Sequence, residues 1–355
     1  MTADFRWPAK PFSPRDELMM MMRGKVNLII CLGLSFLFSC VSIAKQNTTY
    51  KEYMDGAVGE KYLELYHETY GKGAPIILLH GLGGNLYMWR YLVEPLATDH
   101  RLILIDLKGF GKSPKPYDGK YSMFDQAELI YKFILQNDLH DLILVGHSFG
   151  GEVALLVTQK LAKQEPGRLS KLILIDTVAY PQKLPRVIRM LRMPLLGVLG
   201  LYLIPDKIKV RNMMKMVYFD DSKITPEDIE ASATPLSLPG AKYAMRQTAK
   251  QIIPENISEL LATYSRVNVP TLIVWGREDK IIPLENGVRL HQAIGNSQMV
   301  IIDRCGHSPQ EDRPGEVIET IRQFLGDRPR SPGRPPDVKG RSPRVRFGDS
   351  APGTL

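Results

Sequence analysis

A serine flanked by glycines follows a short apolar run in the segment Gly146-His147-Ser148-Phe149-Gly150-Gly151. Leu142 to Val145 precede the segment and helix-compatible residues follow it through Ala162, so the pattern predicts a strand, a sharp turn and a helix. Such a turn holds a hydroxyl in an exposed position, and the helix N-terminus beneath it favours negative charge on a reacting oxygen. We therefore predict that Ser148 is a nucleophile; the alternative is an inert turn serine.

The groups that would activate this serine follow other predicted strands. Asp279 comes after the apolar run 271–276, and His307 comes after the run 299–302. A histidine can take the serine proton as a base, and a carboxylate can hold the imidazole in the required tautomer. Asp176, at the end of the run 172–175, is the alternative acid. The chain order Ser148, Asp279, His307 is that of the α/β-hydrolases and differs from the order in chymotrypsin or subtilisin.

A glycine-rich turn, His80-Gly81-Leu82-Gly83-Gly84, follows the apolar run 76–79. The backbone N–H groups of Leu82 and Phe149 are the predicted oxyanion hole, because both can point at the oxygen that becomes negative when serine attacks a carbonyl. We expect His80 and His147 to orient loops rather than to react. Asp106 also ends a predicted strand, and we expect it to bind the N–H groups of the following loop.

Together these segments resemble the α/β-hydrolase family with a cap domain, over roughly residues 60 to 326. The resemblance rests on the motifs 80–84, 106–113, 146–151, 276–279 and 306–307. Asp312 is a small departure, since the family more often has glutamate there. The resemblance implies an α/β-hydrolase fold within residues 45–326, with a mostly parallel central sheet flanked by helices. A helical cap at about 178–264, inserted after the sixth strand, is also expected.

The same resemblance implies an esterase or lipase-like serine hydrolase. It would cleave an ester or thioester of a small apolar acyl substrate through an acyl-enzyme, with Ser148, His307 and Asp279 as the triad. A carbon–carbon bond hydrolase acting on a vinylogous diketone from aromatic ring cleavage is the alternative enzyme. A non-catalytic protein that only binds a ligand in the pocket is the alternative of another class. Epoxide hydrolases and dehalogenases are disfavoured, because they carry aspartate where Ser148 stands.

Composition limits the remaining classes. The 355 residues are 44% hydrophobic, enough for one large α/β domain, and the formal net charge is +8. Much of that charge comes from the predicted cap and the C-terminal tail, so we expect no nucleic-acid partner. The sequence shows no phosphate-binding loop, dinucleotide fingerprint or zinc-ligand cluster, so we expect no cofactor and no metal. Cys305 stands alone in the folded domain, and we expect a buried, unreactive thiol.

The predicted cap begins with an unusual stretch. Leu184, Val187, Ile188 and Leu191 form an apolar stripe beside Arg186, Arg189 and Arg192, and residues 195–204 are almost wholly apolar. One interpretation is a cap helix that packs over the active site with its arginines in water. The other is a basic, apolar surface that docks on an anionic membrane or admits long acyl chains.

The two ends of the chain carry the expectations about localisation. Residues 1–22 are interpreted as an unstructured leader or a mis-called start, and residues 23–44 as a signal peptide, a lipoprotein signal or a membrane anchor. Lipidation of Cys40, cleavage after Ala44 and an uncleaved anchor remain open. We therefore expect an exported or membrane-anchored protein of a bacterial cell envelope. Residues 327–355, rich in Pro and Arg, are predicted to be a disordered basic tail.

Overall fold

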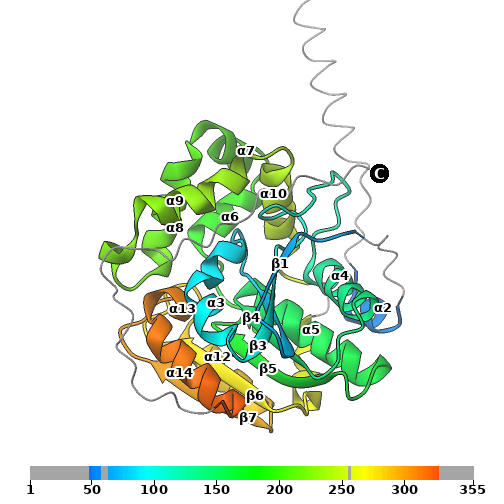
Figure 1. Ribbon diagram of the computed structural model, residues 1–355. Helices are drawn as coiled ribbons and strands as arrows, with labels where there is room; N and C mark the ends of the chain where they lie inside the picture. The colour runs from blue at the N-terminus through cyan, green and yellow to red at the C-terminus, as the bar shows by residue number, and fades with distance from the viewer. Residues whose placement is uncertain (1–47, 57–62, 255–256, 328–355) are drawn as a thin grey trace, which may run out of the picture. The chain divides into compact units, whose positions relative to one another are not determined.

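The computed structural model describes residues 48–56, 63–254 and 257–327. Within them a seven-stranded sheet runs through the centre, in the order β1-β3-β2-β4-β5-β6-β7 (Figure 1). Its strands are His67–Tyr70 (β1), Ala74–Leu79 (β2), His100–Ile105 (β3), Leu142–His147 (β4), Leu169–Ile175 (β5), Thr271–Gly276 (β6) and Ser297–Ile302 (β7). Only β1 is antiparallel, against β3, and the other neighbours are parallel. The predicted mostly parallel sheet is confirmed.

Helices cover both faces of this sheet. One face carries α2, α4, α5 and α12, and the other carries η1, α3 and α14, with α13 beside them (Figure 1). The bounds of these helices are Tyr50–Met54 (α2), Leu86–Trp89 (η1, a 3-10 helix), Arg90–Leu96 (α3), Met123–Gln136 (α4), Phe149–Gln164 (α5), Leu284–Ala293 (α12), Pro309–Asp312 (α13) and Pro314–Leu325 (α14).

The two apolar cores explain why the strands are nearly all apolar. Successive side chains of a strand point to opposite faces, so a strand that is covered on both faces reads as one continuous apolar run. In β2, Ile77 and Leu79 pack in the core with α4 and α5, while Ile76 and Leu78 pack in the core with α3 and α14.

A group of helices is inserted between β5 and β6, at the position expected for a cap, and stands over the sheet at the top of Figure 1. We predicted the insertion after a sixth strand; among the described strands it follows the fifth, β5. The inserted elements are Arg186–Arg192 (α6), Pro194–Leu203 (α7), Asp206–Val217 (α8), Asp221–Lys223 (η2), Pro226–Ala233 (α9), Thr234–Ser237 (η3), Ala241–Gln251 (α10), Ile257–Leu261 (α11) and Tyr264–Arg266 (η4).

A buried arginine joins the inserted helices to the sheet domain. Arg90, at the start of α3, lies 2.9 Å from a carboxylate oxygen of Asp228 in α9 and 2.5 Å from one of Glu311 in α13. All three side chains are at least nine-tenths buried. One cation between two anions therefore holds three elements together where water cannot screen the charges.

Several predictions about the chain ends lie outside the described residues. These are the leader at 1–22, the export or anchor segment at 23–44 with Cys40 and Ala44, and the tail beyond residue 327. The predicted start of the tail is one residue early, because Asp327 still accepts a hydrogen bond of 3.0 Å from His100 of β3. In the part of the chain that the structure describes, no helix has the length and apolar character needed to cross a bilayer.

Replacing Arg90 by alanine should lower the free energy of unfolding by about 3–5 kcal/mol, because Asp228 and Glu311 then remain as buried charges without a cation. Urea denaturation monitored by circular dichroism measures the change. Arg277→Ala is the matched control: it breaks the exposed ion pair with Asp303 and should cost less than about 1 kcal/mol. Equal effects of the two variants would contradict the proposed role of Arg90.

Candidate active site

Ser148 occupies the sharp turn that the sequence predicted, between the end of β4 and the start of α5. Its φ of 54° and ψ of −119° are a strained combination for a residue with a side chain. The flanking glycines make room for the turn: a Cβ on Gly146 would lie 2.4 Å from the carbonyl oxygen of Gly150. The turn presents the hydroxyl at the edge of the sheet where parallel strands end.

His307 and Asp279 meet this hydroxyl from two other loops. His307 Nε2 lies 2.9 Å from Ser148 Oγ, and His307 Nδ1 lies 2.7 Å from Asp279 Oδ2. The structure thus brings the three predicted residues together in series, with all three side chains buried. Nδ1–H donates to the carboxylate, which leaves Nε2 as the acceptor for the serine proton.

Asp279 is held as an anion. Burial by itself disfavours its charged form, but His307 and the N–H groups of Ile281 and Ile282, at 2.7 and 2.9 Å from Oδ1, outweigh this and hold the pKa of Asp279 below its usual value. A charged Asp279 can stabilise the imidazolium that forms when His307 takes the serine proton.

Asp176, the alternative acid, lies beside this group and is not the residue hydrogen-bonded to His307. One of its oxygens accepts a hydrogen bond from the backbone N–H of Gly276. Burial, reinforced by the negative charge of Asp279, raises the pKa of Asp176 well above its usual value. Asp176 therefore binds the Gly276 N–H beside Asp279, and it is not the acid that contacts His307.

These three groups are also the one cluster of possible metal ligands among the described residues. One ligand atom each from Asp176, Asp279 and His307 lies within 4.8 Å of the others. Both ring nitrogens of His307 already form hydrogen bonds within the triad. The cluster is thus arranged to move a proton.

The predicted oxyanion donors border the serine. Phe149 is the first residue of α5, and the loop after β2 passes so close that a Cβ on Gly81 would lie 3.0 Å from Ser148 Cβ. No hydrogen bond from the backbone N–H of Leu82 or Phe149 reaches another described residue. Both residues also line the cavity at Ser148, so they stay the predicted oxyanion donors.

His147 and His80 orient loops, as the sequence indicated. His147 Nε2–H donates to the carbonyl oxygen of His307 at 2.7 Å, and burial lowers the pKa of His147 to about 3. His80 accepts a hydrogen bond from the Leu107 N–H at 3.0 Å, and burial lowers its pKa to about 4. Both rings are neutral at neutral pH. Asp106 binds the N–H groups of Leu86 and Lys112, as expected for a structural carboxylate.

Asp312 has a structural role that the sequence did not reveal. Its Oδ2 accepts hydrogen bonds of 2.8 Å from the N–H groups of Gly306 and Phe219. The His307 N–H donates to the carbonyl oxygen of Val217 at 2.7 Å. The loop that carries His307 is therefore bonded to the end of α8 in the cap. Cys305, in the same loop, is fully buried, and burial raises the pKa of its thiol.

A cavity of about 220 Å³ opens at Ser148 and His307, between the sheet edge and the inserted helices. Most of its wall is apolar, with residues such as Val187, Ile188, Met213, Met214 and Ile257. Among the described residues that line it there is no lysine or arginine, whereas Glu152 and Glu311 both contribute.

Glu152 is an acid that the sequence analysis treated only as part of a helix. It lies one turn after Ser148 on α5, lines the cavity and is 1% exposed. Burial raises its pKa from the ordinary value of 4.5 to about 8. The Tyr264 hydroxyl lies 2.7 Å from the carbonyl oxygen of Ala179 and 3.1 Å from Glu152 Oε1. Tyr264 can thus donate to Ala179 and accept from a neutral Glu152.

Comparison with known proteins identifies the family. Residues 74–314 match the family model described as alpha/beta hydrolase fold. The chain therefore belongs to the α/β-hydrolase family.

One curated relative and two solved structures illustrate what the chain is similar to. A 2-hydroxy-6-oxononadienedioate/2-hydroxy-6-oxononatrienedioate hydrolase from Paraburkholderia xenovorans is 29% identical over 281 residues, covering 75% of this chain and 92% of that one. The structure of a meta-cleavage product hydrolase from Pseudomonas fluorescens is similar in fold, with a TM-score of 0.62 and 23% identity over 74% of this chain and 94% of that one. An esterase structure from Thermogutta terrifontis has a TM-score of 0.58 and 27% identity over 74% of this chain and 93% of that one.

Substitution of the two neighbouring acids should separate their roles. Asp279→Asn should lower kcat about ten-thousand-fold, because an amide cannot hold the required histidine tautomer or stabilise the imidazolium. Asp176→Asn should lower kcat less than about tenfold, because Asp176 does not contact His307 and the amide oxygen of asparagine can still accept the hydrogen bond from the Gly276 N–H. Steady-state rates of both variants test this, and a larger loss in Asp176→Asn would reverse the assignment.

Replacing Glu152 by glutamine should alter how stability depends on pH. Between pH 4.5 and about 8 the folded chain keeps the Glu152 proton that the unfolded chain loses, so this group destabilises the fold as the pH rises. The gain in the free energy of unfolding on Glu152→Gln should therefore be larger at about pH 8 than at about pH 5. Urea denaturation at both pH values measures it, and a gain independent of pH would show that Glu152 is charged in the fold.

Proposed function

We propose that the chain is a serine hydrolase that cleaves an ester of a neutral, apolar acyl substrate through an acyl-enzyme. The observation that carries this proposal is the composition of the cavity wall at Ser148. The described wall is mostly apolar, contains no cationic side chain and contains two buried carboxyl groups.

The site geometry supports the following steps. Ser148 Oγ attacks the substrate carbonyl carbon while its proton passes to His307 Nε2, and the carbonyl oxygen becomes negative between the N–H groups of Leu82 and Phe149. The protonated His307 then donates its proton to the leaving alcohol as the carbon–oxygen bond breaks. In the second half a water attacks the acyl carbon, again losing its proton to His307, and the acid leaves as Ser148 regains a proton.

The charge of the wall bears on the substrate class. A carboxylate that enters an apolar cavity loses its hydration, and this cost must be offset by a cation or by several hydrogen bonds. Glu152 is neutral at neutral pH and Glu311 is already paired with Arg90, so the described wall offers a substrate carboxylate no unpaired cation. A neutral acyl group, in contrast, gains from burial against Val187, Ile188 and Met213.

Carbon–carbon bond hydrolysis is the second candidate, and the comparisons favour it. The Paraburkholderia relative is named as a hydrolase of 2-hydroxy-6-oxo dienedioates and trienedioates. A triad of the same kind can also help water to add to the ketone of such a compound. The relative's named substrate is a dicarboxylate, which the described cavity wall does not suit. If this chain cleaves a carbon–carbon bond, we infer that the substrate is an uncharged vinylogous diketone.

A non-catalytic binding protein is the least supported alternative. A binding site needs no aligned proton relay, yet His307 is within hydrogen-bonding distance of both Ser148 and Asp279. Retention of this geometry supports turnover.

The purified protein should hydrolyse p-nitrophenyl esters of apolar acids and should discriminate strongly against substrates that carry a carboxylate. Ser148→Ala should reduce kcat by at least about a thousand-fold, since it removes the nucleophile. The measurement compares kcat/KM for a neutral ester, the matched half-ester of a dicarboxylic acid, and neutral and acidic vinylogous diketones.

Ser113→Ala provides the control, because Ser113 is a buried serine in the loop that follows β3 and is outside the triad. It should keep the activity of the parent chain on every substrate. Turnover of the acidic diketone alone would contradict the proposed substrate class, and turnover of the neutral diketone alone would establish the second candidate.

A further inference from the structure

The first two inserted helices, α6 and α7, form a hairpin whose inner side is well packed. Ile188 and Leu191 of α6 and Leu201 of α7 share a buried cluster with Ala249 of α10. Gly197 lets the two helices approach closely, since a Cβ there would lie 2.6 Å from the carbonyl oxygen of Leu191. The orientation of α7 is therefore fixed by its inner residues, Gly197 and Leu201.

The outer side of α7 is apolar and exposed. At 3.6 residues per turn, Leu195, Leu199, Tyr202 and Leu203 lie opposite Gly197 and Leu201. Leu195 is 68% exposed, Tyr202 63% and Leu203 73%. Met193 before the helix and Ile204 after it are exposed as well. Contiguous apolar surface of this kind marks a place of interaction on a soluble domain.

The charged residues of the segment that forms this surface are all basic. The segment 177–205 contains no aspartate or glutamate but contains Lys183, Arg186, Arg189 and Arg192. All four are exposed, and none forms an ion pair with a described residue. The next acid along the chain, Asp206, is already paired with Lys209 and Lys242.

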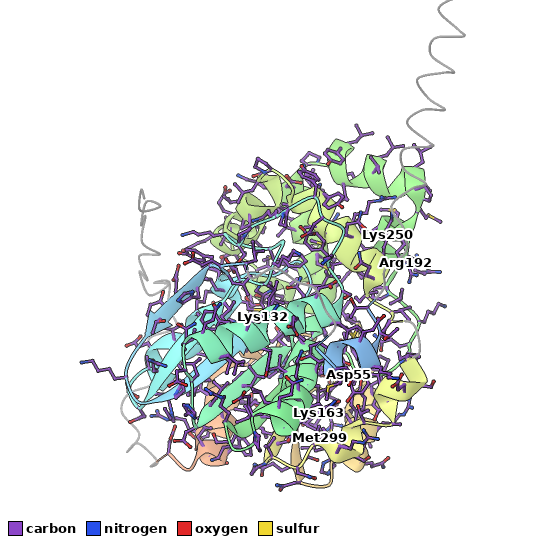
Figure 2. The ribbon with its side chains drawn as sticks, turned by 90° about the vertical axis from the view of Figure 1, so that its right-hand side faces the viewer. Asp55, Lys132, Lys163, Arg192, Lys250 and Met299 are labelled. Carbon is purple, nitrogen blue, oxygen red and sulfur yellow. The ribbon has the colours of Figure 1, made fainter. Side chains whose placement is uncertain are left out.

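Another lysine lies at the same end of the molecule. Lys250 is on α10, which packs against α6. Figure 2 shows Arg192 and Lys250 together in its upper part, away from Asp55, Lys163 and Met299. Arg192 of the hairpin and Lys250 of α10 therefore lie toward the same end of the described domain.

We propose that the outer face of the α6–α7 hairpin docks on an anionic lipid bilayer. The exposed leucines of α7 enter the interface between headgroups and acyl chains, and the basic residues of α6 bind lipid phosphates. Interfacial helices combine an apolar face with Lys and Arg in this way. A single partner has to offer an apolar layer to the leucines and negative charge to the unpaired cations. An anionic membrane offers both.

A second copy of this chain is a poorer partner for the surface. A two-fold contact would place the hairpin against itself, so four exposed cations of one copy would face four of the other. Like charges facing one another oppose such a contact.

Helix α6 contributes residues both to the docking surface and to the cavity wall. Val187 and Ile188 of α6 line the cavity, whereas Arg189 and Arg192 on the same helix are exposed. A docked hairpin would bring the cavity close to the lipid bilayer, in which apolar acyl compounds dissolve. Membrane binding itself does not depend on the proposed activity, so the two proposals can fail separately.

Quenching by brominated lipid tests the docked surface in the full chain. Leu199→Trp places a fluorescent reporter on the outer face of α7, and Lys72→Trp places one in the exposed turn between β1 and β2. Vesicles are made of brominated phosphatidylcholine, with or without phosphatidylglycerol. We expect strong quenching of the reporter at 199 with phosphatidylglycerol, little without it, and little at 72 with either lipid, after subtraction of the parent chain.

Charge reversal gives the second arm. Each basic residue near an anionic surface strengthens binding about fivefold, so the double variant Arg189→Glu and Arg192→Glu should weaken the quenching titration at least about twentyfold. The matched control, Lys51→Glu and Lys72→Glu with the reporter at 199, removes the same charge elsewhere and should change it less than about threefold. Thermal unfolding verifies that both double variants fold. If one of them does not, the quenching of the reporter at 199 in the otherwise unchanged chain still tests whether α7 enters the bilayer.

Three outcomes would overturn the proposal. The first is vesicle binding with no quenching at 199, which would assign binding to another part of the chain. The second is equal weakening by the two charge variants, which would indicate net charge alone. The third is a dimer in analytical ultracentrifugation without lipid that Leu195→Ser abolishes, which would assign the surface to a second copy.

Discussion

The hydrogen bond between Ser148 and His307 is the contact on which the rest of the site depends. The two residues are far apart in the chain, yet Nε2 and Oγ lie 2.9 Å apart. Parallel strands end at one edge of a sheet, so β4, β6 and β7 bring their following loops to the same place. The strained turn at Ser148, the anionic Asp279 and the anchored loop of His307 each act to keep this one distance short.

Burial controls charge throughout the site. His80 and His147 are kept neutral by desolvation, whereas Asp279 stays charged because it has a histidine and two backbone donors as partners. Burial disfavours the charged form of every group. It therefore raises the pKa values of the acids Asp176 and Glu152, just as it lowers those of the two histidines. An anionic Asp279 in contact with His307, together with a neutral Glu152 beside the cavity, suits a reaction that starts from neutral reactants.

The cap helps to position the loop of His307 and also covers the cavity. Through Asp312 the loop of His307 is bonded to Phe219, and through Arg90 the sheet domain is bonded to α9. The same inserted helices shape the apolar cavity and, on the outside, form the basic and apolar hairpin surface. Substrate selection and positioning of the base are therefore physically linked.

Local sequence patterns were enough to predict the sheet, the serine turn and the loops that carry Asp279 and His307. Each of these features depends on a strand followed by a turn, and both leave a signal within about ten residues. Arg90, Asp228 and Glu311 leave no such signal, because they pair only after three distant elements have packed. The neutral state of Glu152 could not be predicted from the sequence either. It depends on the burial of the side chain in the fold and not on its neighbours in the chain. The same holds for Asp327, which continues the fold through His100, in another strand.

Covalent labelling of the serine tests the central claim most directly. A fluorophosphonate reacts with a serine in proportion to its activation, and mass spectrometry of proteolytic peptides identifies the modified residue. The geometry predicts one adduct, on Ser148, and a labelling rate that falls by orders of magnitude when His307 is replaced by alanine. An adduct on a different residue, or labelling of Ser148 at an unchanged rate without His307, would contradict the account.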